Sequence, residues 1–226
     1  MIKLIKRLPF YRRYTTNQFS KWWATRKIDW KKEYVDTWNH PHRQLLSWVL
    51  NTLPWTSLIE VGCGAGANLI NILHYLKKHR NMNLAGIDIN PDAIEMAKQT
   101  LGSFCKGVHL QVCNIENLII SDDASDVILS DMTLIYVDPR KIDKVIKEFH
   151  RVTRSLIVFY EFYSPSWWER FKLRLFSGHN AHNYKKLLTK HGFNDIRVYK
   201  VDERVCEDDT QRQFAHIITA CVPTRK

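Results

Sequence analysis

The sequence has few of the residues that mark special protein classes. Five scattered cysteines among 226 residues, without a C-x-x-C pair, exclude a disulfide framework and a thiolate zinc site. Eight glycines and seven prolines exclude a collagen-like chain. No apolar run approaches the ~18 to 20 residues of a membrane-spanning helix, and the N-terminus lacks the apolar segment of a secretory signal. The apolar content of 45% instead predicts one compact globular domain, and the scattered cysteines are expected to be reduced thiols in a cytoplasmic protein.

Positive charge is concentrated at the start of the chain. Residues 1–43 hold eleven Lys and Arg against three acidic residues, which gives +8 of the formal net charge of +11. The segment is also rich in Phe, Tyr and Trp, so it could bind RNA or lie on an anionic membrane surface. A solvated cap with its aromatic residues packed on the core is the third interpretation.

The first ~13 residues add a more specific hypothesis. Ile2, Ile5 and Leu8 form one helical stripe beside basic residues, which favours peripheral docking on anionic lipid. For the chain as a whole, residues 1–40 are predicted to form a basic aromatic cap and residues 41–226 the main domain.

After residue 40, short β-branched runs alternate with helical patterns, as is typical of a parallel sheet with crossover helices. No convincing helix separates the last two predicted strands, so they are expected to pair as an antiparallel hairpin. The sequence therefore predicts an α/β fold with a Rossmann-like, doubly wound, seven-stranded sheet whose last strand is antiparallel. Strands are predicted at 57–61, 84–89, 107–113, 126–130, 155–162, 195–201 and 212–221, and helices at 41–53, 139–152 and 183–191.

A glycine-rich turn, 60–66, follows the first predicted strand and opens a helix. Its spacing also satisfies the dinucleotide pattern, which leaves a nicotinamide-dependent oxidoreductase as an alternative. Glu60 argues against that alternative, because a carboxylate so close would repel a pyrophosphate. Asp88 ends the second strand, where it could accept hydrogen bonds from ribose hydroxyls. A nucleoside with a cationic tail in place of phosphates is S-adenosylmethionine.

Four segments in order resemble the motifs of the class I S-adenosylmethionine-dependent methyltransferases, over roughly residues 40–220. They are LIEVGCGAG at 58–66, LAGIDINP at 84–91, VCNIENL at 112–118 and DVILSDM at 126–132. The resemblance implies S-adenosyl-L-methionine as the cofactor and S-adenosyl-L-homocysteine as the product. It also implies that Asn114 replaces the usual adenine-contacting Asp. The cofactor-binding residues so implied are Glu60, Gly62, Cys63, Gly64, Asp88, Ile89, Asn114, Ile115 and Asp131.

The acceptor is less closely defined by the motifs. Residues 130–133, Ser-Asp-Met-Thr, lack the Asn/Asp-Pro-Pro-aromatic signature, and no Pro-Cys pair is present, which disfavours two classes of nucleic-acid methyltransferase. Residues 130–138, 149–152 and 159–165 resemble the small-molecule subgroup instead. Candidate bases are Asp131, Glu161, His179 and His182. Candidate acceptor-binding residues are Trp38, Tyr136, Tyr163, Trp167 and His182.

No metal is predicted, because His179 and His182 have no third ligand at a suitable spacing. The predicted function is methyl transfer to an O or N atom of a small-molecule acceptor. An RNA- or protein-directed methyltransferase that uses the basic arm is one alternative. A non-catalytic interaction module on the same fold is another.

Overall fold

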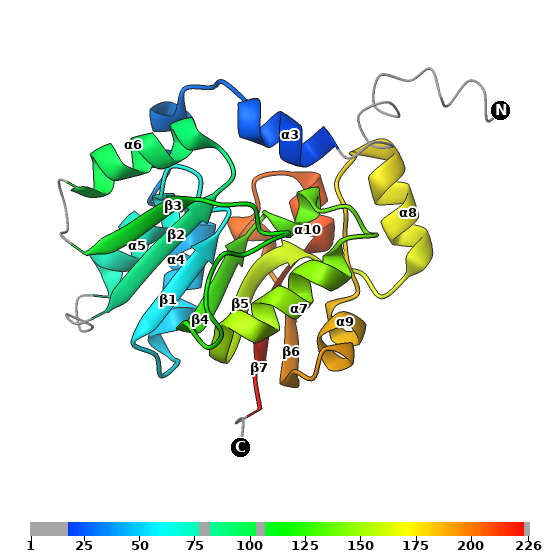
Figure 1. Cartoon of the computed structure of the whole chain (residues 1–226). Coiled ribbons are helices and arrows are strands. Elements are labelled where there is room, and N and C mark those ends of the chain that lie inside the picture. Colours follow the sequence, from blue (N-terminus) through cyan, green and yellow to red (C-terminus); the bar gives the residue numbers. More distant parts are fainter. Residues whose placement is uncertain (1–17, 77–81, 103–106, 224–226) are drawn as a thin grey trace.

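A single mixed sheet organises the chain in the computed structural model, which describes residues 18–76, 82–102 and 107–223 (Figure 1). The strand order is β3-β2-β1-β4-β5-β7-β6. The first five strands are parallel, and β7 runs antiparallel between β5 and β6. This confirms the predicted seven-stranded, Rossmann-like sheet and its reversed last strand. The strands are β1 (Ser57–Val61), β2 (Asn83–Asp88), β3 (Val108–Val112), β4 (Ser125–Asp131), β5 (Thr153–Phe162), β6 (Asn194–Lys200) and β7 (Ala215–Cys221).

Two apolar clusters fill the two faces of the sheet. The apolar sides of α4 (Pro41–Asn51), α5 (Ala67–Tyr75) and α6 (Pro91–Gly102) share one cluster, and α7 (Ile142–Val152) and α9 (Tyr184–Lys190) share the other. Successive side chains of a strand point to opposite faces. Accordingly, Val158 and Tyr160 of β5 belong to the first cluster and Phe159 to the second. Burial on both faces explains why the central strands are almost continuously apolar.

Two helices near the C-terminal part of the chain are absent from the sequence prediction. They are α8 (Trp167–Phe176), capped by Ser166, and α10 (Asp209–Phe214), capped by Asp208, whose side chain accepts from the Gln211 N–H at 2.8 Å. The expected antiparallel pairing of β6 with β7 is confirmed. The expectation that no helix stands between them was wrong, since η3 (Glu203–Val205) and α10 lie there and β7 begins only at Ala215.

The described part of the N-terminal segment crosses the edge of the sheet at which the parallel strands end. It contains α3 (Gln18–Thr25) and a single π-helical turn, η1 (Lys31–Val35), before α4 (Figure 1). The basic stripe predicted for the first ~13 residues lies outside the described residues. Among the residues that the structure does describe, no helix is both long and apolar enough to cross a membrane.

The packing of α7 gives a direct test of the fold. Phe149 is fully buried and meets the ring of Phe159 edge-on at 6.0 Å. Truncation leaves a cavity, so Phe149→Ala is expected to lower the free energy of unfolding by about 3 to 5 kcal/mol in urea titrations. Phe176→Ala, at a side chain that is 75% exposed, should change it by less than about 0.5 kcal/mol. Equal losses in the two variants would contradict this packing.

Candidate active site

A cavity of about 540 Å³ lies at the carboxyl ends of the parallel strands. Its wall follows the sheet, from Asn114 after β3, through Asp88 at the end of β2 and Gly62 after β1, to Asp131 at the end of β4. Strand order reverses between β1 and β4, and open α/β sheets bind ligands at such a switch point. The cavity wall includes all nine residues implied above for the cofactor: Glu60, Gly62, Cys63, Gly64, Asp88, Ile89, Asn114, Ile115 and Asp131.

The turn after β1 needs glycine for space and for backbone conformation. Gly62 has a φ of +71°, and a Cβ there would lie 2.1 Å from the Thr133 hydroxyl oxygen. Gly64 has a φ of +52°, and its Cβ would lie 3.0 Å from the Tyr34 ring. Both angles are in the left-handed region that side chains disfavour. The chain is thereby folded tightly, with its backbone forming part of the cavity wall.

Asp88 joins the ends of β1 and β2. One carboxylate oxygen accepts the Gly64 N–H at 2.9 Å and the other accepts the Asn90 N–H at 2.8 Å. Burial raises the pKa of Asp88, and these backbone hydrogen bonds oppose the rise. The carboxylate therefore holds the glycine turn in place while it faces the cavity.

Glu60 is an acidic side chain with an unused oxygen. It is 2% exposed, and its Oε1 accepts a hydrogen bond from the Asn68 amide at 2.7 Å. Within the described residues, Oε2 has no hydrogen-bond partner. Burial raises the pKa of Glu60 to about 8, and the Asn68 hydrogen bond offsets only part of the rise. Such a group would be stabilised by a cationic ligand that donates to Oε2.

Asp131, at the end of β4, is held by three residues that the sequence analysis did not single out. Its Oδ2 contacts Arg43 Nη1 at 3.1 Å, Asn68 Nδ2 at 2.9 Å and His42 Nε2 at 3.2 Å. Burial raises the pKa of Asp131, but His42, Arg43 and Asn68 outweigh it and hold the pKa at about 2. Within the described residues, Oδ1 has no hydrogen-bond partner. A carboxylate whose pKa is held this low is a weak base, so the structure argues against that predicted role.

The other end of the cavity is aromatic. Tyr136 lies 4.9 Å from the Trp23 ring and 5.9 Å from the Phe19 ring, both on α3, and 5.5 Å from the ring of His179. Phe162, where β5 ends, lies 5.9 Å from His179. The predicted candidates Tyr136 and His179 are thus brought together beneath α3.

His179 carries a ring nitrogen without a partner. Its Nδ1 is buried and makes no hydrogen bond to any residue that the structure describes. Burial lowers the pKa of His179, so the imidazole is neutral near pH 7. A neutral, unpartnered nitrogen can accept a proton, which distinguishes His179 from the paired Asp131.

Glu161 lies behind the cavity wall. It is fully buried, and its Oε1 accepts hydrogen bonds from the Ser130 hydroxyl at 2.7 Å and from the Thr133 and Leu134 N–H groups at 2.9 and 3.0 Å. It therefore shapes the loop after β4 and has no place on the cavity surface. This position corrects the prediction of Glu161 as a base.

Four predicted acceptor-binding residues also lie outside the cavity lining. His182 is buried with Nε2 3.2 Å from the Leu134 carbonyl, and burial lowers its pKa to about 4. Trp38 packs on His74 at 4.8 Å and Tyr163 on His216 at 5.2 Å, whereas Trp167 is exposed on α8. Aromatic composition does not reveal which of these side chains face inward.

The family is established by a comparison with models of known protein families. The model described as a methyltransferase domain matches residues 54–219, which include most of the cavity. The chain is a class I S-adenosylmethionine-dependent methyltransferase. This excludes the oxidoreductase alternative. No curated protein matches the sequence.

Solved structures share the fold of this methyltransferase at low sequence identity. The PH0226 protein from Pyrococcus horikoshii OT3 is 16% identical with a TM-score of 0.63, over 87% of this chain and 100% of that chain. Magnesium protoporphyrin IX methyltransferase from Synechocystis PCC 6803, with bound S-adenosylmethionine, is 15% identical with a TM-score of 0.60, over 93% of both chains. Phosphoethanolamine N-methyltransferase 2 from Haemonchus contortus is 12% identical with a TM-score of 0.61, over 82% of this chain and 53% of that chain.

The cavity of this methyltransferase fits the cofactor. The unused Oε2 of Glu60 would accept from the ammonium group, Asp88 would accept from the ribose, and the glycine turn leaves room for close approach. Ile89 and Ile115 offer apolar contacts for the adenine. When bound, S-adenosylmethionine supplies a methyl group on a sulfonium, which is a good leaving group.

Three side chains of the methyltransferase lie close enough together to hold a metal ion. His40, His42 and Glu207 place one ligand atom each within 4.8 Å of one another, and the two imidazole Nδ1 atoms are 2.6 Å apart. The existing contacts of His42 with His40 and Asp131 also explain this cluster without an ion. The absence of a metal remains a prediction from the sequence.

The raised pKa of Glu60 makes cofactor binding pH-dependent. Below about pH 8 the carboxyl is largely protonated, and an ammonium ligand favours its ionised form. The affinity for S-adenosylhomocysteine is therefore expected to rise about tenfold or more between pH 6 and pH 8, measured by calorimetry. Glu60→Gln, which cannot ionise, should bind more weakly with a flat profile. An equal slope in both proteins would rule out Glu60 as the cause.

Proposed function

We propose that this methyltransferase transfers the methyl group to an O or N atom of a small-molecule acceptor. The observation that carries the proposal is the aromatic part of the cavity lining, where Trp23 and Phe19 of α3 contact Tyr136. An extended nucleic-acid or protein chain suits an open groove, whereas this cavity is lined by aromatic residues of the N-terminal segment itself. Such walls suit an apolar or planar acceptor.

The names of similar structures are consistent with small acceptors of several kinds. The Haemonchus contortus structure contains phosphomonomethylethanolamine, and a geranyl diphosphate methyltransferase with a TM-score of 0.61 contains GPP. A carbon methyltransferase, at 17% identity and a TM-score of 0.62, has the same fold. The fold is therefore compatible with O, N and C acceptors. A candidate base beside the cavity favours an acceptor atom that loses a proton.

The basic N-terminal segment, residues 1–43, gives the RNA-directed alternative less support than its net charge of +8 suggests. Arg43 points into the cavity and pairs with Asp131, while Lys27 pairs with Asp92 and Lys31 with Asp36. The Arg26 guanidinium lies over the Trp22 and Trp23 rings, at 4.6 and 4.7 Å. In residues 18–43, much of the positive charge is thus engaged within the protein. Residues 1–17 lie outside the described part of the chain.

His179 is proposed as the base that accepts the proton of the acceptor on its Nδ1. His179→Ala should lower kcat by about 100-fold or more, because a positioned base contributes this much to proton transfer. It should leave affinity for S-adenosylhomocysteine within about twofold, because the His179 ring packs on Tyr136 and Phe162 and not on the glycine turn. Activity of the unmodified enzyme should fall as pH drops through the lowered pKa of His179. Unchanged kcat in the variant would eliminate this role.

The acceptor class can be tested before the acceptor is known. Release of S-adenosylhomocysteine is measured with three fractions of a cell extract: filtered small molecules, an organic-solvent extract, and macromolecules. Turnover is expected with the first or second fraction and should resist nuclease and protease treatment. Asp88→Ala is the control for cofactor dependence. Turnover with the macromolecular fraction alone, abolished by nuclease or protease, would replace the proposal with the RNA- or protein-directed alternative.

A further inference from the structure

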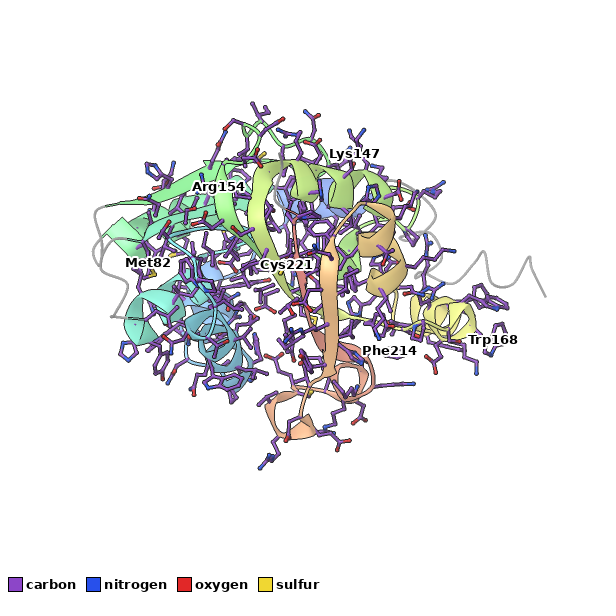
Figure 2. All side chains as sticks on the ribbon, turned by 90° about the horizontal axis from the view of Figure 1, so that it is seen from below. Met82, Lys147, Arg154, Trp168, Phe214 and Cys221 are labelled. Carbon is purple, nitrogen blue, oxygen red and sulfur yellow. The ribbon has the colours of Figure 1, made fainter. Side chains whose placement is uncertain are left out.

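Helix α8 has an unusual concentration of exposed aromatic side chains. Nine large hydrophobic side chains are exposed in the described residues, and four of them are on this one helix. Figure 2 shows Trp168 at the outer edge of the molecule, pointing away from the sheet. A contiguous exposed apolar patch on a soluble protein commonly marks a binding surface. The four are Trp167 at 68%, Trp168 at 48%, Phe171 at 50% and Phe176 at 75% exposed.

These side chains occupy one side of the helix. At about 100° per residue, Trp167, Phe171, Trp168 and Phe176 fall within one half of the helix circumference. The opposite half holds the buried Leu173 and Arg170, whose guanidinium donates to the Ser164 and Pro165 carbonyls at 2.8 Å each. The aromatic half therefore faces outward in a fixed orientation.

The charges of α8 match an anionic surface. Lys172 lies within the aromatic half, with its ammonium 5.3 Å from the centre of the Trp168 ring. Arg174 lies at one edge of this half. The one acidic residue, Glu169, lies at the other edge and accepts a hydrogen bond from the Ser164 hydroxyl at 2.5 Å. Trp and Phe beside Lys and Arg on one helix are the composition of helices that lie in a lipid headgroup layer.

The position of α8 connects this face to the cavity. In the sequence, the helix lies between Phe162 and His179, and both of these residues line the cavity. A surface that binds α8 is thus held at the rim of the site. In Figure 1, α8 lies at the outer edge of the molecule, beyond α7 and α9.

We propose that the aromatic face of α8 docks on an anionic lipid bilayer and presents the cavity to an acceptor that resides in the membrane. Docking follows from the exposed residues alone and is independent of the reaction. The identification of the acceptor as an amphiphilic molecule rests on the function proposed above.

Co-sedimentation of the full chain with vesicles tests the docking. Binding is expected with phosphatidylcholine vesicles that contain about 30% phosphatidylglycerol, and it should weaken with pure phosphatidylcholine and at high salt. The double variant Trp167→Ser and Phe171→Ser should lower the partition coefficient about tenfold or more, because two aromatic side chains no longer insert. Lys172→Glu should also weaken binding. Trp48→Ser, at a 65% exposed tryptophan on α4, is the matched control and should bind normally.

Three results would overturn the proposal. The first is the absence of vesicle binding. The second is that the α8 double variant binds vesicles normally, whereas the triple variant Lys3→Gln, Lys6→Gln and Arg7→Gln does not bind, which would assign docking to the N-terminal segment. The third is a dimer in sedimentation velocity that the α8 double variant dissociates, which makes the face a contact between copies. The acceptor assay above stays informative in each case. Turnover with filtered small molecules but none with the organic extract would refute only the amphiphilic acceptor.

Discussion

The buried carboxylate of Asp131 is the constraint on which the site depends. An ionised group at the end of a central strand must be paired, because an isolated buried charge is strongly unfavourable. His42 and Arg43 at the start of α4, and Asn68 on α5, supply the partners. Since Asn68 also donates to Glu60, the two carboxylates share one hydrogen-bonded support. The helices are thereby drawn over the sheet edge, where these three residues form part of the cavity wall.

This arrangement gives the two ends of the cavity different chemistry. Glu60 and Asp88, both with raised pKa values, form an acidic end that suits a ligand with a cationic tail and hydroxyl groups. Tyr136, Phe162 and His179 form an aromatic end with a neutral nitrogen. One cavity thus has a hydrogen-bonding end and an aromatic end of different chemistry.

The aromatic residues of the chain serve several purposes that composition cannot separate. Trp23 lines the cavity, Trp38 packs against His74 outside the cavity, and Trp168 is exposed on α8. Each environment depends on which residues from distant parts of the sequence come to lie beside the side chain. The exposed aromatic face of α8 could not be foreseen for the same reason, because exposure is a property of the folded surface.

Local periodicity and motifs anchored at strand ends were enough to predict the sheet and its reversed last strand. They also pointed to nine candidate cofactor residues, which the structure places in one cavity wall. They missed α8 and α10, whose caps at Ser166 and Asp208 are single-residue signals in polar loops. The environments of Asp131 and Glu161 depend instead on contacts between distant parts of the chain. Both end up buried at neighbouring strand ends, yet Arg43 and His42 hold one ionised, whereas burial raises the pKa of the other to about 8. Ionisation of a carboxyl depends on its partners in space, and these partners come from positions far apart in the chain.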